Sequence, residues 1–265
     1  NPGFSALFKI GFSDLFEDFK LIGGMRVPVN FNSSEFLVGM EFLPNRLDHK
    51  IILYRNAYKD VESVSGDFVK WKTHEVRYRM SYPFTETFSI RGTFNYRNDH
   101  KVYLSYDDIS IDQRPENTSQ AGVKAELVYD DSKSLGVNLW EGSKLKIFGE
   151  YLQSFSSGFG AMYNVGFDFR HSIKVHRNLI WVNRLAFGAS FGQNRILYYL
   201  GAVDGWWEFN NDKRFDNTVE VDPNESYAFQ AIGTPVRGFK QNIRNGNSFA
   251  VFNSELRWPL FSYFS

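Results

Sequence analysis

The stretch "KLKIFGEYLQ", residues 144–153, alternates between two kinds of side chain and decides the fold class. One parity is apolar or small and the other carries the charges: Leu145, Ile147, Gly149 and Tyr151 against Lys144, Lys146, Phe148 and Glu150. A period of two residues indicates a β-strand whose two sides meet different surroundings. A helix would repeat its apolar positions every three to four residues.

This period of two recurs along the chain, and helical periodicity is almost absent. Most of the predicted strands have about ten residues or more, which suits a tilted strand that crosses a ~30 Å hydrocarbon layer. Strands of ordinary globular sheets average about 5–6 residues. The predicted strands are 4–13, 19–29, 35–43, 49–58, 68–83, 86–106, 120–130, 144–155, 160–173, 179–192 and 247–261.

Composition points the same way. Of the 265 residues, 18 % are aromatic and 43 % are hydrophobic, yet no apolar run reaches the roughly 18 residues of a transmembrane helix. So many rings would line two surfaces at once if one side of each strand met lipid. Because lipid tolerates no open sheet edge, such strands must close into a barrel. We therefore predict an all-β chain forming an antiparallel transmembrane β-barrel, with a soluble aromatic-rich sandwich or a large ligand-binding barrel as the alternative.

Charge and cysteine content exclude several other classes. Thirty basic and thirty acidic residues balance, so no net field favours nucleic acid as a partner. The absence of cysteine removes disulfides, thiolate nucleophiles and cysteine zinc sites. We expect no cofactor and no metal. The opening Asn1-Pro2-Gly3 reads as the start of a mature domain or of a fragment.

The connections between the predicted strands alternate in length. Short ones fall at every second junction, and longer or more polar ones lie between them, as in outer-membrane barrels with short periplasmic turns. Two junctions fit less well: 30–35 is brief where a long loop is expected, and 131–143 is long where a turn is expected. The alternation places the longest connection, 193–246, on the outer side.

Within that connection lies Val236-Arg237-Gly238-Phe239, an arginine between apolar neighbours. Removing a guanidinium from water is costly unless an anion hydrogen-bonds to it, and its planar fork suits a carboxylate. Gly238 permits backbone conformations closed to other residues, or a close approach to a wall. We expect Val236 and Phe239 to pack against that wall. A turn tip with an incidental arginine is the plainer interpretation.

These residues in their setting resemble the BamA/TamA-type surface-antigen superfamily of Gram-negative outer-membrane barrels. The resemblance rests on Val236–Phe239, on the following "NSFAVFNSELRWPLF" at 247–261, and on 127–151 and 170–192 before the loop. It implies a barrel of about sixteen strands, of which about eleven are present here, so 1–265 is expected to be a barrel domain that is incomplete at both ends. It also implies a 193–246 loop that folds into the lumen and an acidic partner for Arg237, with Glu255 as that partner or its neighbour. The first hundred residues resemble Bacteroidetes-type members with an upstream TolB-like propeller.

The resemblance implies a function in the bacterial outer membrane: assisting insertion or translocation of other polypeptides, with the arginine loop bracing the lumen. Its partners would be outer-membrane lipid, client polypeptides, other envelope proteins, and periplasmic or surface accessory subunits. A passive porin-like channel, or a structural barrel anchoring a periplasmic domain or envelope complex, is the alternative.

We expect no enzyme activity. The stretch Gly188–Gly192 matches a G-x-S-x-G nucleophile motif formally but opens no helix, which that motif requires. For Trp206 and Trp207 in the long loop, we expect packing of the folded-back loop, although contact with lipid headgroups or a partner is an alternative.

Overall fold

The structure is a computed structural model that describes residues 5–28, 33–61, 68–104, 114–156, 160–201, 215–225 and 227–259. Regular structure in these ranges consists of β-strands alone. No helix in the described part of the chain is long and apolar enough to span a membrane. The prediction of an all-β chain is therefore confirmed.

The strands form two sheets. The larger has twelve strands in the order β1-β2-β3-β4-β5-β6-β7-β9-β10-β11-β15, with β8 on β9, and the smaller has the order β13-β12-β14. In the larger sheet, the pairs β1–β2, β2–β3, β3–β4, β4–β5, β8–β9, β10–β11 and β11–β15 are antiparallel, as predicted. The strands are β1 Ser5–Ser13, β2 Phe19–Pro28, β3 Ser34–Phe42, β4 Asp48–Val61, β5 Phe68–Pro83, β6 Phe88–Tyr103, β7 Glu116–Asp130, β8 Lys133–Gly136, β9 Leu139–Ser154, β10 Ala161–His176, β11 Leu179–Gly192, β12 Arg195–Gly201, β13 Tyr227–Pro235, β14 Arg244–Gly246 and β15 Ser248–Arg257.

Two predictions about connections need correction. The connection 131–143 holds a hairpin, because β9 begins at Leu139 and pairs with the short β8 across a turn at Val137-Asn138. Asn138 has φ 60°, a left-handed conformation that asparagine tolerates better than most residues. The long connection 193–246 was predicted without strands, yet it contains β12, β13 and β14. We call these three strands the loop sheet.

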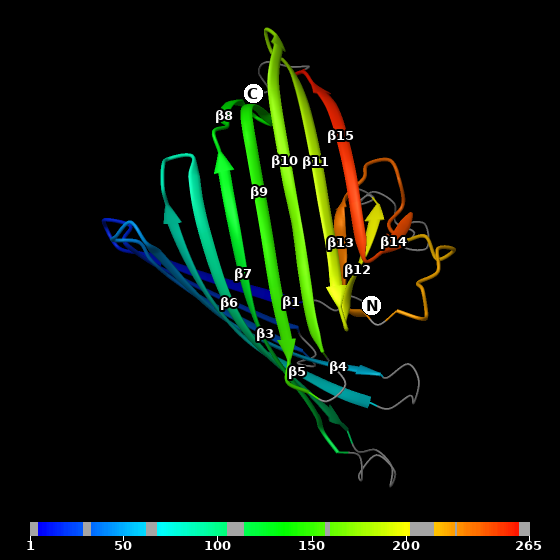
Figure 1. Cartoon of the computed structure of the whole chain (residues 1–265). Coiled ribbons are helices and arrows are strands. Elements are labelled where there is room, and N and C mark those ends of the chain that lie inside the picture. The colour runs from blue at the N-terminus through cyan, green and yellow to red at the C-terminus, as the bar shows by residue number, and fades with distance from the viewer. Residues whose placement is uncertain are drawn as a thin grey trace. The chain divides into compact units, whose positions relative to one another are not determined.

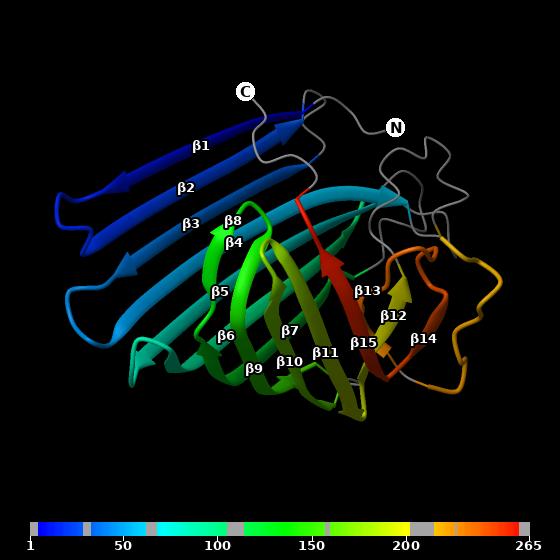
Figure 2. The same ribbon diagram turned by 90° about the horizontal axis from the view of Figure 1, so that it is seen from above.

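The chain divides into two compact units, one of Asn1–Pro83, Arg91–Lys124 and Leu152–Phe159, the other of Phe84–Ile90, Ala125–Tyr151 and Gly160–Ser265. In the first unit each strand from β1 to β5 pairs with the next, so they form a meander; β1 to β4 lie side by side in Figure 2. In the second unit β11 pairs with β10 on one edge and with β15 on the other. The loop sheet follows β11 and precedes β15 in the chain, and it lies beside β15 in Figure 1.

The first unit has two chemically different faces. Register pairs Leu53 with Val76 on one side of β4 and β5, and these side chains are 42 % and 41 % exposed. On the other side, Lys50 pairs with Glu41, and the hydroxyl of Tyr54 donates to Glu35. We call the two sides the apolar face and the polar face.

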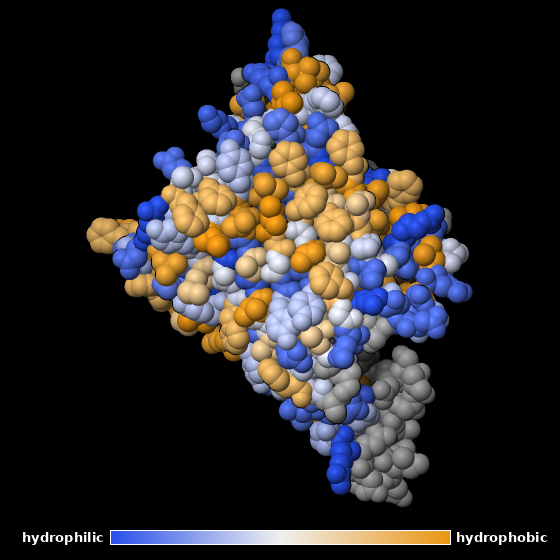
Figure 3. Space-filling view, viewed as in Figure 1, coloured by the Kyte–Doolittle hydropathy of each residue, from blue (hydrophilic) through white to orange (hydrophobic). Residues whose placement is uncertain are grey.

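The second unit repeats this division. Odd-numbered residues of β10 and β11 form its apolar face, which spreads over the middle of these strands in Figure 3. They include Tyr163, Val165, Phe169, Ile173, Trp181 and Leu185, each between 38 % and 44 % exposed. Even-numbered residues carry the polar face, where Arg184 Nη2 lies 2.5 Å from Asp168 Oδ2 on the neighbouring strand. The alternation read from 144–153 therefore extends over both units.

Aromatic rings mark ends of the apolar faces. In the second unit, Tyr163 lies between Tyr151 and Phe191, with ring centroids 5.1 and 5.7 Å away. In the first unit, His49 lies between Phe42 and Tyr78, close to the short turn 43–47. Rows of rings across neighbouring strands are typical of the interfacial girdles of membrane barrels.

Candidate functional site

The loop sheet packs on the polar face of the second unit. The backbone N–H of Ile196 donates to Ser190 Oγ at 2.9 Å, and the hydroxyl of Tyr198 donates to Asn164 Oδ1 at 2.7 Å. The ring of Tyr198 meets Phe249 of β15 edge-on, with centroids 5.0 Å apart. The described part of 193–246 is thus attached to β10, β11 and β15 by polar and aromatic contacts.

Glycines allow this close approach. A Cβ at Gly188 of β11 would lie 2.5 Å from Phe249 Cε1, and one at Gly233 of β13 would lie 2.8 Å from Phe249 Cδ1. The Phe249 ring therefore fills a slot between β11 and the loop sheet. A side chain larger than hydrogen at Gly188 or Gly233 would close this slot. Ser190, in the same "GASFG" stretch, is 2 % exposed and accepts the Ile196 N–H, so it holds the loop sheet in place.

Beside this contact, the arginine motif approaches its predicted partner. Arg237 Nη1 lies 3.4 Å from Glu255 Oε1, and Arg257 Nη2 lies 2.9 Å from the other oxygen of the same carboxylate. The N–H of Val236 donates to the carbonyl of Gly201 at the end of β12, which anchors the motif to the loop sheet.

The surroundings of Arg237 differ from the prediction. Its side chain is 71 % exposed, and Phe239 is 52 % exposed, so the guanidinium is not withdrawn from water and Phe239 does not wedge against a wall. Glu255 is shared, because it also pairs with Arg257 on its own strand. Gly238 has φ 83°, and a Cβ there would meet nothing within 4 Å. Gly238 is therefore used for its backbone conformation and not for a close approach to a wall.

An open recess of about 520 Å³ lies between the motif and the strands. Its charged lining combines one carboxylate, Glu255, with four arginines: Arg170, Arg184, Arg237 and Arg257. Asp168 binds two of them, because its carboxylate accepts hydrogen bonds from both Arg170 and Arg184. The polar face here carries two clusters of opposite charges, one around Asp168 and one around Glu255.

Trp206 and Trp207, predicted to pack the loop, lie outside the described residues. Within the described residues, no group of three or more histidine, aspartate or glutamate side chains could hold a metal ion.

No family model and no curated protein matches the chain. Among solved structures, the chain is similar to BamA from Haemophilus ducreyi lacking POTRA domains 1–3, with a TM-score of 0.46 and 12 % identity. The match covers 71 % of this chain and 42 % of that chain, so this chain spans less than half of its length. The assignment to the surface-antigen superfamily stays a prediction.

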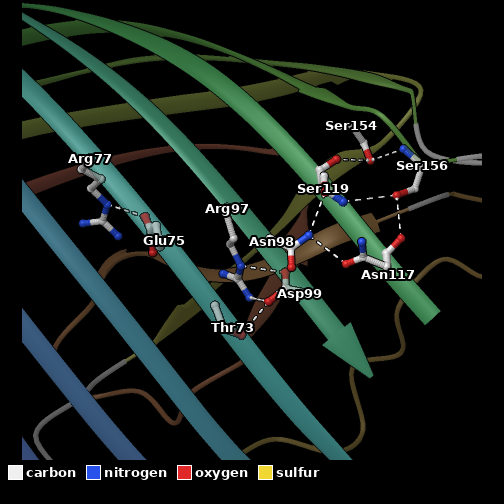
Figure 4. Close-up of polar contacts among 10 residues, drawn as sticks. All are labelled: Thr73, Glu75, Arg77, Arg97, Asn98, Asp99, Asn117, Ser119, Ser154 and Ser156. Carbon is white, nitrogen blue, oxygen red and sulfur yellow. Dashed lines mark hydrogen bonds and ion pairs between the residues drawn. The ribbon is translucent and has the colours of Figure 1, made fainter. Parts of the chain in front are cut away.

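The first unit has its own network on the polar face (Figure 4). Asp99 accepts hydrogen bonds from Thr73 at 2.6 Å and from Arg97 at 2.7 and 3.0 Å, and Arg77 pairs with Glu75. Sequence reasoning did not single out these residues or the Asp168 network. The signal was available, because charged residues two apart on a strand share a face.

Proposed function

We propose that this chain belongs to an outer-membrane β-barrel that assists the insertion or translocation of other polypeptides, with the loop sheet and its Arg237 motif bracing the polar interior. The observation that carries the membrane part is the division of each strand into an apolar and a polar face. The loop sheet attached to the polar face carries the rest.

Lipid explains the apolar face better than a second protein layer. In a soluble sandwich the apolar side of a sheet packs against another sheet. Here Leu185 and Phe252 are 40 % and 65 % exposed, and no second sheet covers them in the described part of the chain. A contiguous apolar surface of this kind marks contact with a membrane or with a partner. Strands of 14 to 16 residues are long enough to cross a bilayer with residues to spare.

The polar face suits the inside of such a barrel. Its charges are matched on neighbouring strands, as in Arg184 with Asp168 and Lys144 with Asp130. Paired charges are tolerated where an unpaired one would be costly. A wide diffusion pore needs this space to stay open, whereas the loop sheet occupies part of it. This favours a machine whose interior is braced over a passive channel.

The proposed mechanism is physical. A client strand would pair with an exposed strand edge of the barrel by backbone hydrogen bonds, the mode called β-augmentation. The loop sheet would hold the wall in one state while this happens. This part of the proposal draws on the resemblance of 127–151, 170–192 and 236–239 to the insertion family.

The test uses the full-length protein in liposomes with a urea-unfolded small β-barrel as client. Folded client is measured by its heat-modifiable mobility on gels. We expect faster client folding than in empty liposomes, and a loss of that gain when the loop sheet is loosened by Gly188→Ala. Equal client folding with and without the protein, together with large steady conductance in planar bilayers, would show a passive channel instead.

A further inference from the structure

The apolar face of the first unit becomes basic toward the ends of β4 and β5 that lead to 62–67. Four cations lie on this side of the sheet: Arg55 and Lys59 on β4, and Lys70 and Lys72 on β5. The register places them together, because Lys59 is opposite Lys70, and Lys72 is opposite Ala57 between Arg55 and Lys59. We call these four residues the basic patch.

The change from apolar to basic occurs at one level on both strands. After the apolar pair of Leu53 and Val76, this face carries Arg55 opposite His74, Ala57 opposite Lys72 and Lys59 opposite Lys70. Val61 and Phe68 then form an apolar pair at the very ends of the two strands. On β6 and β7 the corresponding ends carry an uncharged polar cluster, in which Asn98 Nδ2 donates to Asn117 and Ser119 (Figure 4). An apolar band that ends in polar residues on successive strands has the form of a membrane boundary.

Arg55 fits such a boundary. Its guanidinium carbon lies 5.8 Å from the centroid of the Phe36 ring on the neighbouring β3. Its apolar stem can therefore lie along the lipid-facing surface while its charge stays at the polar edge, as long cationic side chains do at membrane interfaces.

Among the residues that the structure describes, the basic patch lacks the counter-charges that cations on the polar face have. There, Lys50 pairs with Glu41, Arg77 with Glu75 and Lys101 with Glu116. In the described residues, no carboxylate forms an ion pair with any of the four patch cations. Lys59 directly opposite Lys70 is a like-charge pair, which destabilises a sheet. An external anion would remove this repulsion.

We propose that the basic patch binds the phosphate groups of an anionic lipid headgroup, with phosphorylated lipid A as the outer-leaflet lipid of this chemistry. The inference rests on the proposed membrane barrel, because the patch continues the lipid-facing surface at the level of the headgroups. Arginine binds phosphate through its planar fork and lysine as a point charge. A lipid is favoured over free phosphate because its acyl chains would cover the adjoining Leu53 and Val76.

The experiment places full-length protein in phosphatidylcholine nanodiscs that contain either phosphorylated or dephosphorylated lipid A at equal amounts. Lipid retained by the released protein is counted by native mass spectrometry. Each basic residue near an anionic headgroup strengthens binding by about fivefold, so Lys59→Gln, Lys70→Gln and Lys72→Gln together should weaken retention of phosphorylated lipid A by about a hundredfold. Dephosphorylated lipid A should be retained weakly by both proteins.

A matched control removes three exposed lysines elsewhere: Lys9→Gln, Lys133→Gln and Lys174→Gln. This variant has the same net charge as the patch variant and should retain lipid A like the wild type. Equal retention of both lipid A forms, or an unchanged patch variant, overturns the inference and leaves the barrel standing. Displacement of lipid A by millimolar inorganic phosphate in detergent would indicate a site for free anions and would overturn the proposal that the occupant is a lipid. Failure to form a heat-modifiable barrel in nanodiscs overturns both proposals.

Discussion

Tyr198 donates its phenolic hydrogen to Asn164 Oδ1 across 2.7 Å, and this bond joins the loop sheet to the wall at β10. Both residues are buried, Tyr198 at 7 % and Asn164 at 6 % exposure. Water therefore has little access to take the place of either hydrogen-bond partner. The Asn164 amide also donates to Glu150 at 3.3 Å. The attachment therefore runs from the loop sheet through β10 to β9.

We expect Tyr198→Phe to destabilise the protein by about 1–3 kcal/mol, because it leaves the buried Asn164 oxygen without its donor. The free energy of unfolding in urea, followed by loss of heat-modifiable mobility, measures this. Tyr199→Phe is the matched control, since the neighbouring Tyr199 is less buried and meets Phe215 through its ring. A Tyr198→Phe effect no larger than that of Tyr199→Phe would contradict the role of this bond.

The same tyrosine predicts a dependence on pH. Burial, aided by the nearby Glu150 carboxylate, raises the pKa of Tyr198 to about 12 from its ordinary 10.0. The protonated hydroxyl therefore contributes its full stabilisation of the fold below pH 10. This contribution to the unfolding free energy is lost as pH rises from 10 toward 12. The difference in unfolding free energy between wild type and Tyr198→Phe should thus shrink across that interval. A constant difference from pH 8 to pH 12 would show that the hydroxyl is not buried.

Gly188→Ala should cost about 1–3 kcal/mol of stability, because the new methyl would overlap the Phe249 ring. Gly149→Ala is the control: it is also in a strand, nothing lies within 4 Å of a Cβ there, and we expect a change within about 0.5 kcal/mol. Phe249→Leu combined with Gly188→Ala should recover part of the loss. If both glycine variants lose equal stability, the slot is not the cause.

Arg237 and Glu255 should be coupled only weakly. With the arginine side chain 71 % exposed, a double-mutant cycle of Arg237→Ala and Glu255→Gln should give about 0.2–1 kcal/mol. Glu255→Gln alone should cost more than Arg237→Ala alone, because it also removes the partner of Arg257. A coupling of several kcal/mol would mean that the pair is desolvated in the complete protein. The rate of client folding measured with the Arg237→Ala protein tests the bracing role separately.

Sequence reasoning reached the features that depend on neighbours along the chain. The parity of 144–153 predicted which side chains share a face, and the pairs Lys146 with Glu126 and Lys144 with Asp130 lie on the expected side. Glu255 could be named as a candidate for Arg237 because it is the one acidic residue after the motif. The pairing of Glu255 with Arg257 could also have been predicted, because residues two apart on a strand share a face.

The loop sheet could not be predicted in this way. β12 and β13 pair in parallel over a separation of about thirty residues, and nothing local in "RILYYLG" or "YAFQAIGTP" specifies that pairing. Its attachment depends on Tyr198, Asn164 and Phe249, which come from three distant strands. The slot at Gly188 is likewise visible only when β11, β13 and β15 are brought together.

The central claim is that the apolar faces meet lipid and the polar faces meet water, and β10 tests it most directly. Because the chain contains no cysteine, single cysteines can be placed one at a time from Met162 to Val175 and labelled with an environment-sensitive fluorophore. In liposomes of the full-length protein, we predict lipid-like emission and quenching by acyl-chain quenchers at Tyr163, Val165 and Phe169. Labels at Arg170 and Lys174, which are exposed on the polar side of β10, should report water and respond only to aqueous quenchers. Emission without this alternation, or aqueous quenching at every position, would contradict the account.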